Sequence, residues 1–168
     1  MNNRHLLNRE VRHDGTYGRI ILFLATVGGI GYLPIGRGTA VMVPFLFLLP
    51  SFTALSPAVR VGIAAIAIFV AVVIAQSAEA VFGVHDDHRI VIDEAVSLFV
   101  TFASIPAIGI FSPFLVLGFL LNRVLDWTKP FPVSRIQHLS GGWGIVMDDV
   151  ASGAMAGAIL HVTMTLFG

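Results

Sequence analysis

The sequence predicts an all-α membrane protein, built as a polytopic helical bundle. Hydrophobic residues make up 56% of the 168 positions and charged residues only 12%, whereas soluble domains carry about 25% charged residues. The mean hydropathy is +0.87. Several apolar runs also approach the roughly 20 residues that a helix needs to cross a bilayer. We therefore expect a single membrane-embedded domain over residues 1–168, with about five spans.

The composition excludes several classes of function. The formal net charge is zero, so bulk charge gives no reason to expect a nucleic-acid partner. The absence of cysteine excludes disulfides, thiolate metal sites and cysteine-dependent phosphatases. The first apolar run has no small-residue cleavage motif and further apolar runs follow it, so it does not resemble a removed signal peptide. Nothing in the sequence indicates an oligomeric state.

The predicted elements follow from the alternation of polar and apolar segments. Residues 1–19 form a polar tail, and residues 20–34 are apolar but, at about fifteen residues, too short for a comfortable span. We expect this second segment to be re-entrant or interfacial. Ser56-Pro57 and Ser112-Pro113 fit helix starts with proline at the first helical position. The predicted spans lie near residues 41–56, 57–80, 90–106, 112–126 and 146–167.

The distribution of basic residues predicts the orientation. If the helices cross and return in turn, nine of the ten Lys and Arg residues lie on the same side as the acids, and Arg60 lies near the other side. Basic residues concentrate on the cytoplasmic side of membrane proteins. We therefore expect a bacterial-type inner membrane protein with a cytoplasmic N-terminal tail and a functional site that faces the cytoplasm.

The stretch from Glu79 to Glu94, EAVFGVHDDHRIVIDE, gathers five acids between two apolar runs. Carboxylates beside hydrocarbon are costly unless they bind a metal, pair with a cation or face a wet cavity. This stretch is therefore the predicted functional centre. The polar residues that follow it are spaced as one helical face, which we expect to point into the bundle; this face comprises Asp93, Ser97, Thr101 and Ser104.

Two further segments carry cations. Arg123, Asp126 and Lys129 recur at intervals of three, so a continuing helix would project them as one cluster. Arginine can grip two phosphate oxygens and lysine adds a point charge, although a basic belt at the lipid surface has the same composition. The tetrad from Gly36 to Thr39 adds a cation between two glycines that let the backbone approach a ligand, and it would also suit a plain turn.

A glycine-rich turn from residue 141 leads to Asp148 and Asp149 at the start of the last apolar run. Such a pair suits a metal site, but the positive end of a helix dipole would also favour each acid by about 0.3 to 1 kcal/mol. Gly153 and Gly157 form a GxxxG pair, which predicts close packing on another helix of the same bundle. His161 is expected to be structural.

Three blocks of the sequence together resemble the phosphatidylglycerophosphatase A family of Mg-dependent lipid phosphatases. The blocks are GVHDDHRIVIDE, NRVLDWTKPFPV and GGWGIVMDDVASGAMAG, and the resemblance runs from about Gly28 to Leu160. Family members continue an early Gly-Thr as a GTxGS-like run, whereas Ala40, Val41 and Met42 follow Thr39 here. The resemblance implies hydrolysis of phosphatidylglycerophosphate to phosphatidylglycerol and inorganic phosphate on the cytoplasmic leaflet.

These patterns define the expected site. A phosphomonoester dianion needs positive charge, which an acid cluster supplies by binding Mg²⁺ through oxygen ligands. Other phosphatase motifs, such as DxDx[TV] and the P-loop, do not occur, so a water molecule is the expected nucleophile. The identity of the general base is left open. The metal candidates are Glu79, Asp86, Asp93, Glu94, Asp148 and Asp149; the catalytic candidates are Asp93, Glu94, Asp126 and Asp149; the substrate-binding candidates are Arg37, Thr39, Arg123 and Lys129.

Two other classes of function remain open, an ion pathway and a non-catalytic scaffold. A transporter or channel could pass ions along Asp93, Glu94 and Asp148, but an ion pathway needs a relay and no acid lies in the middle of a predicted span. A non-catalytic scaffold would leave the acids dispensable.

Overall fold

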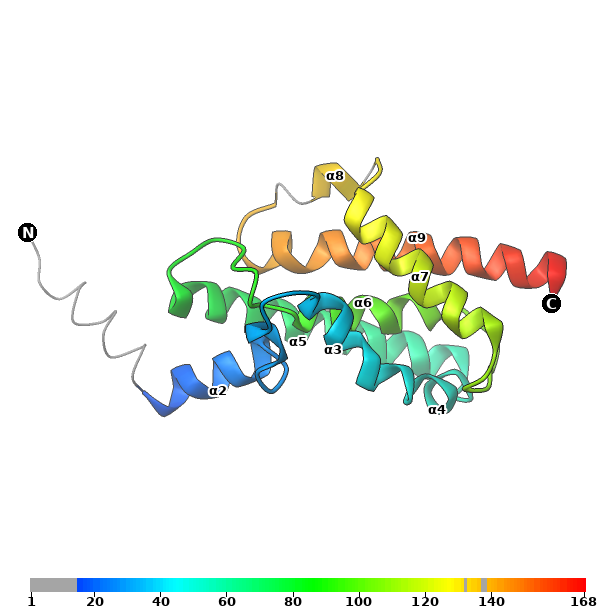
Figure 1. Cartoon of the computed structure of the whole chain (residues 1–168), viewed down its shortest axis with the longest axis horizontal. Helices are drawn as coiled ribbons and strands as arrows, with labels where there is room; N and C mark the ends of the chain where they lie inside the picture. The colour runs from blue at the N-terminus through cyan, green and yellow to red at the C-terminus, as the bar shows by residue number, and fades with distance from the viewer. Residues whose placement is uncertain (1–14, 132, 137–138) are drawn as a thin grey trace, which may run out of the picture.

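The computed structural model describes residues 15–131, 133–136 and 139–168, and every regular element in this part of the chain is helical (Figure 1). This confirms the all-α prediction. Of the polar tail predicted at residues 1–19, residues 1–14 lie outside the described residues. The elements are α2 (Thr16–Ala25), the short 3₁₀ helix η1 (Ile30–Tyr32), α3 (Arg37–Leu46), α4 (Leu49–Thr53), α5 (Pro57–Phe82), α6 (Ile92–Phe102), α7 (Pro113–Thr128), α8 (Val133–Ile136) and α9 (Gly142–Phe167).

Prolines and glycines mark the helix ends, as their backbone preferences require. Pro57 and Pro113 occupy the first positions of α5 and α7, each after an extended serine whose side chain makes no cap hydrogen bond. Gly83 ends α5 in the left-handed region, with φ of 70°. The predicted helix starts are therefore confirmed, but the fixed φ of proline defines them rather than a serine hydroxyl.

Only α5 and α9, among the described helices, are long and apolar enough to cross a membrane. Each has 26 residues, about 39 Å at 1.5 Å per residue, against a hydrocarbon core of about 30 Å. The other predicted spans hold shorter helices: α6 has 11 residues and α7 has 16. Five spans are thus not confirmed. Hydropathy identified these segments as apolar, but apolar side chains buried inside a bundle look the same as those facing lipid.

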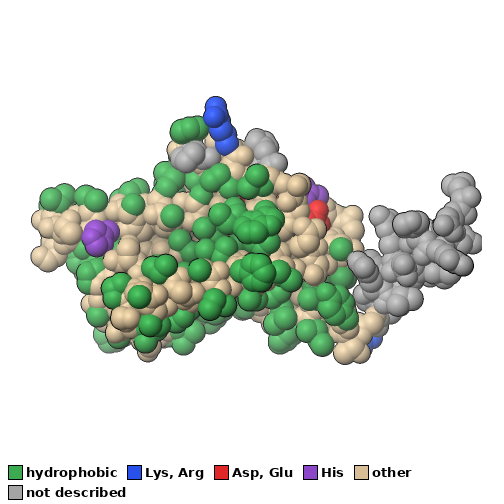
Figure 2. Space-filling view, turned by 180° about the vertical axis from the view of Figure 1, so that it is seen from behind, with side chains coloured by type: hydrophobic (Ala, Val, Ile, Leu, Met, Phe, Trp, Pro, Cys, Tyr) green, Lys and Arg blue, Asp and Glu red, His purple; other side chains and the backbone are tan. Residues whose placement is uncertain are grey.

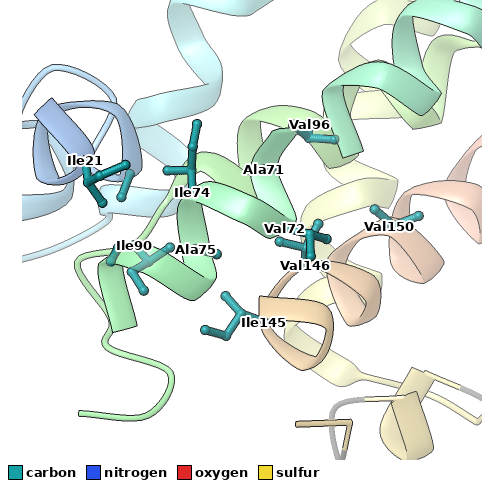
Figure 3. Packing of buried hydrophobic residues seen from close by; sticks show 12 residues of the cluster. Ile21, Ala71, Val72, Ile74, Ala75, Ile90, Val96, Ile145, Val146 and Val150 are labelled. Carbon is teal, nitrogen blue, oxygen red and sulfur yellow. The ribbon is translucent and has the colours of Figure 1, made fainter. Parts of the chain in front are cut away.

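Helix α9 packs against α5, α6 and α7 (Figure 1). One core cluster joins α2, α5, α6 and α9, and Figure 3 shows Val72 of α5 beside Val146 of α9. A second cluster packs α3, α4 and α7 around Leu98 and Phe102 of α6. Helices α6 and α9 each contribute to both clusters, α9 through Leu160 in the second one.

Two glycines allow α6 and α9 to pack backbone against backbone. A β-carbon on Gly153 would lie 2.5 Å from the carbonyl oxygen of Ser97, and one on Gly157 would lie 2.6 Å from that of Thr101. The predicted GxxxG contact is therefore confirmed, and its partner is α6.

The predicted polar face of α6 points into the bundle for three of its four residues. Asp93, Ser97 and Thr101 are buried, and the amide of Asn122 on α7 donates to the hydroxyls of Ser97 at 3.1 Å and Thr101 at 2.9 Å. Ser104 is the exception, because α6 ends at Phe102 and the serine beyond it is exposed. Its carbonyl oxygen lies 3.2 Å from Nδ1 of His161, which fits the structural role expected of that histidine.

Hydrophobic side chains cover much of the outer surface, as the face drawn in Figure 2 shows. On α5, Val61, Ile66 and Phe69 are each more than half exposed. Exposed apolar surface on this scale marks a membrane or partner interface. Together with the length of α5 and α9, it indicates membrane association.

The α6–α9 contact predicts that Gly157→Ala destabilises the bundle. The new methyl group would meet a backbone oxygen that cannot rotate away, and overpacking of this kind costs about 1 to 3 kcal/mol. Gly62→Ala is the matched control, since nothing lies within 4 Å of its β-carbon position on α5. Thermal unfolding in detergent should show a lowered midpoint for Gly157→Ala and an unchanged or raised one for Gly62→Ala. Equal midpoints would contradict the packing.

Candidate active site

Three carboxylates from two helices converge at one end of the bundle. Asp93 and Glu94 lie in the first turn of α6, and Asp149 lies in the second turn of α9. One oxygen of each lies within 4.8 Å of the other two. Asp93 Oδ1, Glu94 Oε2 and Asp149 Oδ2 are buried and have no hydrogen-bond partner. Buried anionic oxygens without partners are expensive, and their convergence fits a hard divalent cation bound through oxygen.

The position of Asp148 and Asp149 decides between the two interpretations of this pair. Helix α9 begins at Gly142, so neither acid lies in its first turn. The stabilisation of acids by a helix dipole falls off within that turn. The dipole interpretation therefore loses its support, and convergence with the acids of α6 is the better explanation for Asp149.

Two cations of the site, Arg123 and Lys129, are each paired with a carboxylate. On α7, Arg123 donates to Asp126 one turn later. Lys129 has left the helix and donates instead to Asp148 on α9, so the expected cluster of three is split between two partners. Asp148 also accepts the amide of Asp149 at 3.0 Å, and these bonds occupy both of its oxygens. It is thus a partner of lysine rather than a member of the converging group.

Lys129 occupies a strained conformation at the end of α7. Its φ of 40° lies in the left-handed region, which non-glycine residues adopt at a cost of about 1 to 3 kcal/mol. Partial burial acts to lower the pKa of Lys129, but the hydrogen bond from its ammonium to Asp148 and the nearby carboxylates outweigh that effect and raise it. The side chain is therefore a fixed positive charge at neutral pH.

Two adjoining cavities form a polar cleft in front of these groups. The wider cavity has a volume of about 700 Å³ and the narrower one about 320 Å³. They share four lining residues, Arg37, Glu94, Asp126 and Trp127. Thr39 and Arg123 line the wider cavity, whereas Asp93, Lys129 and Asp149 line the narrower one. All the predicted substrate-binding residues, and all the predicted metal residues except Glu79, therefore line one continuous cleft.

Gly38 brings the tetrad from Gly36 to Thr39 against the side chains of the site, so the tetrad does not act as a turn alone. A β-carbon at Gly38 would lie 2.2 Å from Glu94 Oε1 and 3.1 Å from an Nη atom of Arg123. The start of α3 can thus lie against Glu94 and Arg123 in their observed positions because this residue has no side chain. Gly36 adopts a left-handed conformation, with φ of 67°, immediately before α3.

Besides Asp148, two predicted metal residues lie apart from the converging carboxylates. Glu79 is on the last turn of α5, where it contacts His85 at 2.7 Å, and it lines neither cavity. Asp86 lines the narrower cavity but is exposed. In the loop that leads to α6, Asp87 forms an ion pair with Arg89 at 2.6 Å. The side-chain hydrogen bonds from Arg89 lower the pKa of Asp87 despite its burial. Sequence proximity grouped these acids, but the loop between α5 and α6 separates them.

Sequence reasoning missed two lining residues, His88 and Trp127. His88 lines the narrower cavity beside Lys129, and Trp127 is 87% exposed and borders both cavities. Trp127 stands between two residues that were selected for their charge, and His88 follows two acids. Their position within the motifs was the available signal, but the residues were selected by charge, and this criterion passed over an aromatic ring and an imidazole.

Comparison with known proteins places the chain in a family. The family model described as phosphatidylglycerophosphatase A matches residues 23–164. The chain belongs to this family. It is 30% identical to an Escherichia coli protein named phosphatidylglycerophosphatase A over 144 residues, which is 82% of this chain and 80% of that one. A Haemophilus influenzae protein of the same name is 38% identical over 82 residues, 48% of this chain and 49% of the relative.

A further relative has a name that refers to a different lipid head group. A Bacteroides thetaiotaomicron protein, provisionally named a phosphatidylinositol-3-phosphatase, is 28% identical over 154 residues, covering 88% of this chain and 95% of the relative. No solved structure matches the chain significantly.

Family membership confirms the resemblance that the three sequence blocks indicated, and it makes the chain a phosphatase. It therefore favours an enzyme over the ion pathway and the scaffold. The acids of the site also gather at one end of the bundle, and they do not extend along it as a relay would require.

The crowding of Asp93, Glu94 and Asp149 predicts that Mg²⁺ stabilises the fold. A ligand that binds only the folded state at 100 times its dissociation constant adds about 2.7 kcal/mol. Asp149→Asn should abolish most of this gain and should itself raise stability in EDTA, because it removes one of three mutually repelling charges. Thermal unfolding with and without Mg²⁺ measures both effects.

The control for this experiment is Asp86→Asn, which removes an exposed acid that lines the same cavity but stands apart from the converging group. It should keep the Mg²⁺-dependent shift of the unmutated chain. An equal shift in Asp149→Asn would show that the metal does not bind at the converging carboxylates.

Proposed function

We propose that this family member hydrolyses the terminal phosphomonoester of phosphatidylglycerophosphate to phosphatidylglycerol and inorganic phosphate. One observation carries the proposal: the unpaired buried oxygens of Asp93, Glu94 and Asp149 face a polar cleft that also holds Arg123 and Lys129. Such a cleft combines the two requirements of phosphoryl transfer, a place for a divalent cation and side chains that bind phosphate oxygens. The names of the relatives support the head group.

The converging carboxylates are the proposed holders of Mg²⁺. A magnesium ion bound by Asp93, Glu94 and Asp149 would supply positive charge to the phosphate oxygens and would favour the deprotonation of water. Gly38 keeps the start of α3 close to Glu94. The nucleophile in this proposal is water, because the chain has no cysteine and lacks the DxDx[TV] and P-loop sequence patterns.

The basic residues bind and orient the phosphate in this scheme. Lys129 is the proposed contact for the terminal phosphate in the narrower cavity, and Asp148 holds its ammonium group in place. Asp126 holds the guanidinium of Arg123 in the same way at the wider cavity. Arg37 borders both cavities and would meet the substrate between them. Hydrogen bonds between charged groups are the strong ones, so each contact is worth about 1.5 to 3 kcal/mol.

The proposed setting is the bacterial inner membrane, with the cleft facing the cytoplasm and segments 41–56, 90–106 and 112–126 joining α5 and α9 as spans. The order of helix ends supports it: α3, α6 and α9 begin near the cleft, whereas α5 and α7 end there. The chain thus alternates in direction as successive spans must. The basic residues collected on the side of the cleft support the cytoplasmic orientation.

The direct test is phosphate release from phosphatidylglycerophosphate by the purified chain in detergent micelles, with Mg²⁺ and with excess EDTA. We expect release with Mg²⁺ and nearly none with EDTA, restored when Mg²⁺ is returned. Phosphatidylinositol 3-phosphate tests the head group named for the Bacteroides relative. Full activity in EDTA would refute the metal requirement, and activity on the inositol lipid alone would refute the substrate.

Binding and metal holding are separated by Lys129→Ala and Asp149→Asn. Loss of the lysine contact should lower kcat/KM by roughly 10- to 100-fold, which corresponds to about 1.5 to 3 kcal/mol, at an unchanged half-maximal Mg²⁺ concentration. Loss of Asp149 should raise that concentration. Arg135→Ala is the control, because it removes an exposed cation of α8 that lines neither cavity. Unchanged Mg²⁺ dependence in Asp149→Asn would contradict the assignment.

The orientation can be tested with single cysteines, since the chain has none of its own. Ser140→Cys precedes α9 near the cleft, and Ser56→Cys precedes α5 at the other end; both serines are exposed. A membrane-impermeant maleimide added to intact cells should label Ser56→Cys and reach Ser140→Cys only after the cells are opened. The reverse pattern would place the cleft outside the cytoplasm.

A further inference from the structure

A third cavity lies beside the polar cleft, and its walls are entirely apolar. Its volume is about 380 Å³. Side chains from α2, α3, α5 and α6 and from the turn after α2 surround it, among them Phe23, Val27, Phe45, Ala67, Val70 and Phe99. No charged or polar side chain occurs among the described residues that line it.

The cavity is too large to be an ordinary packing defect. Protein interiors leave few voids larger than a water molecule, and an apolar cavity of about 150 Å³ is enough to bind benzene. Its floor is formed by buried Ala95 and Val96, whereas at its rim Phe23 is 64% exposed and Val70 is 45% exposed. The space is therefore open to the surroundings of the bundle and can be entered by an apolar ligand.

Helices α3 and α6 each contribute to both this cavity and the polar cleft. On α6, Glu94 faces the cleft and the next residue, Ala95, faces the apolar cavity. On α3, Arg37 lines the cleft and Phe45 lines the apolar cavity. Eight residues of helix separate these two, about 12 Å along the axis, which is the scale of a phosphorylated glycerol head group.

We infer that the apolar cavity binds an acyl chain of the phospholipid whose head group occupies the polar cleft. This inference rests on the proposed function and adds to it a binding site for the lipid tail. The committed occupant is a substrate chain rather than surrounding lipid, because the two helices that build the cavity also build the cleft. A molecule that fills both spaces gains apolar burial and phosphate contacts at once.

A thiol placed in the cavity tests occupancy directly. Ala67→Cys puts a cysteine in its wall on α5, and Ala65→Cys puts one on the exposed side of the same helix. The probe is a long-chain phosphonate analogue of phosphatidylglycerophosphate that cannot be hydrolysed. It should slow modification of Ala67→Cys by an alkyl methanethiosulfonate roughly tenfold, the effect of about two buried methylene groups, and should leave Ala65→Cys unaffected.

Two comparison ligands separate the sources of protection. The deacylated head group should not protect the thiol of Ala67→Cys, and phosphatidylcholine with the same chains should protect it much less than the analogue does. Equal protection by phosphatidylcholine would mean that surrounding lipid fills the cavity, and no protection by the analogue would mean that its chains bind elsewhere. Either result overturns the inference, and neither depends on turnover.

A kinetic measurement distinguishes failure of the inference from failure of the proposed function. A decyl group attached to the thiol of Ala67→Cys should lower kcat/KM for long-chain phosphatidylglycerophosphate at least roughly tenfold. It should leave kcat/KM unchanged for dihexanoyl phosphatidylglycerophosphate, whose chains are too short to reach the cavity. A reducing agent should restore activity. An equal fall for both substrates would indicate distortion of the site and overturn the inference. If the unmodified chain cleaves neither substrate, the proposed function fails, and thiol protection still reports on the cavity.

Discussion

The contact between α6 and α9 is the constraint on which the rest of the structure depends. Gly153 and Gly157 bring the two backbones together, and this approach sets the separation between Asp93 and Glu94 on one helix and Asp149 on the other. Larger residues would force the helices apart and would move the carboxylates out of reach of a shared ligand. Packing in the middle of the bundle therefore determines the chemistry at its end.

Some carboxylates in and near the cleft pair with cations, whereas others have no hydrogen-bond partner. Asp148, Asp126 and Asp87 each pair with a cation. The converging carboxylates keep buried oxygens without partners. A protein interior tolerates such groups only when something else compensates for them. The paired acids therefore hold cations in place, and the unpaired acids are the ones proposed to bind Mg²⁺.

Much of this arrangement could be predicted from residue types and spacing. The apolar composition and the proline-marked starts of α5 and α7 predicted the helices, and the four-residue spacing of Asp93, Ser97 and Thr101 predicted the inward face of α6. The lengths of the helices could not be predicted, because hydropathy does not distinguish contact with lipid from contact with another helix.

Within the site, the positions of helix ends could not be predicted either. Glu79 was grouped with the metal candidates by proximity in sequence, but α5 continues to Phe82 and directs it toward His85. Lys129 was expected on the helical face of Arg123, yet α7 ends one residue earlier and the lysine reaches Asp148 on α9. Both differences arise at helix ends, where a single residue changes the direction of a side chain and where sequence patterns locate boundaries least well.

The polar cleft lies at one end of the bundle, while exposed apolar side chains cover α5 along its length. In a bilayer, this arrangement would give the two proposed products separate exit routes. Inorganic phosphate would leave past exposed Asp86 and His88 into water, and the lipid would diffuse sideways in the plane of the membrane. The products enter different phases and need not pass each other, so a new substrate molecule can approach from the lipid while phosphate departs on the aqueous side.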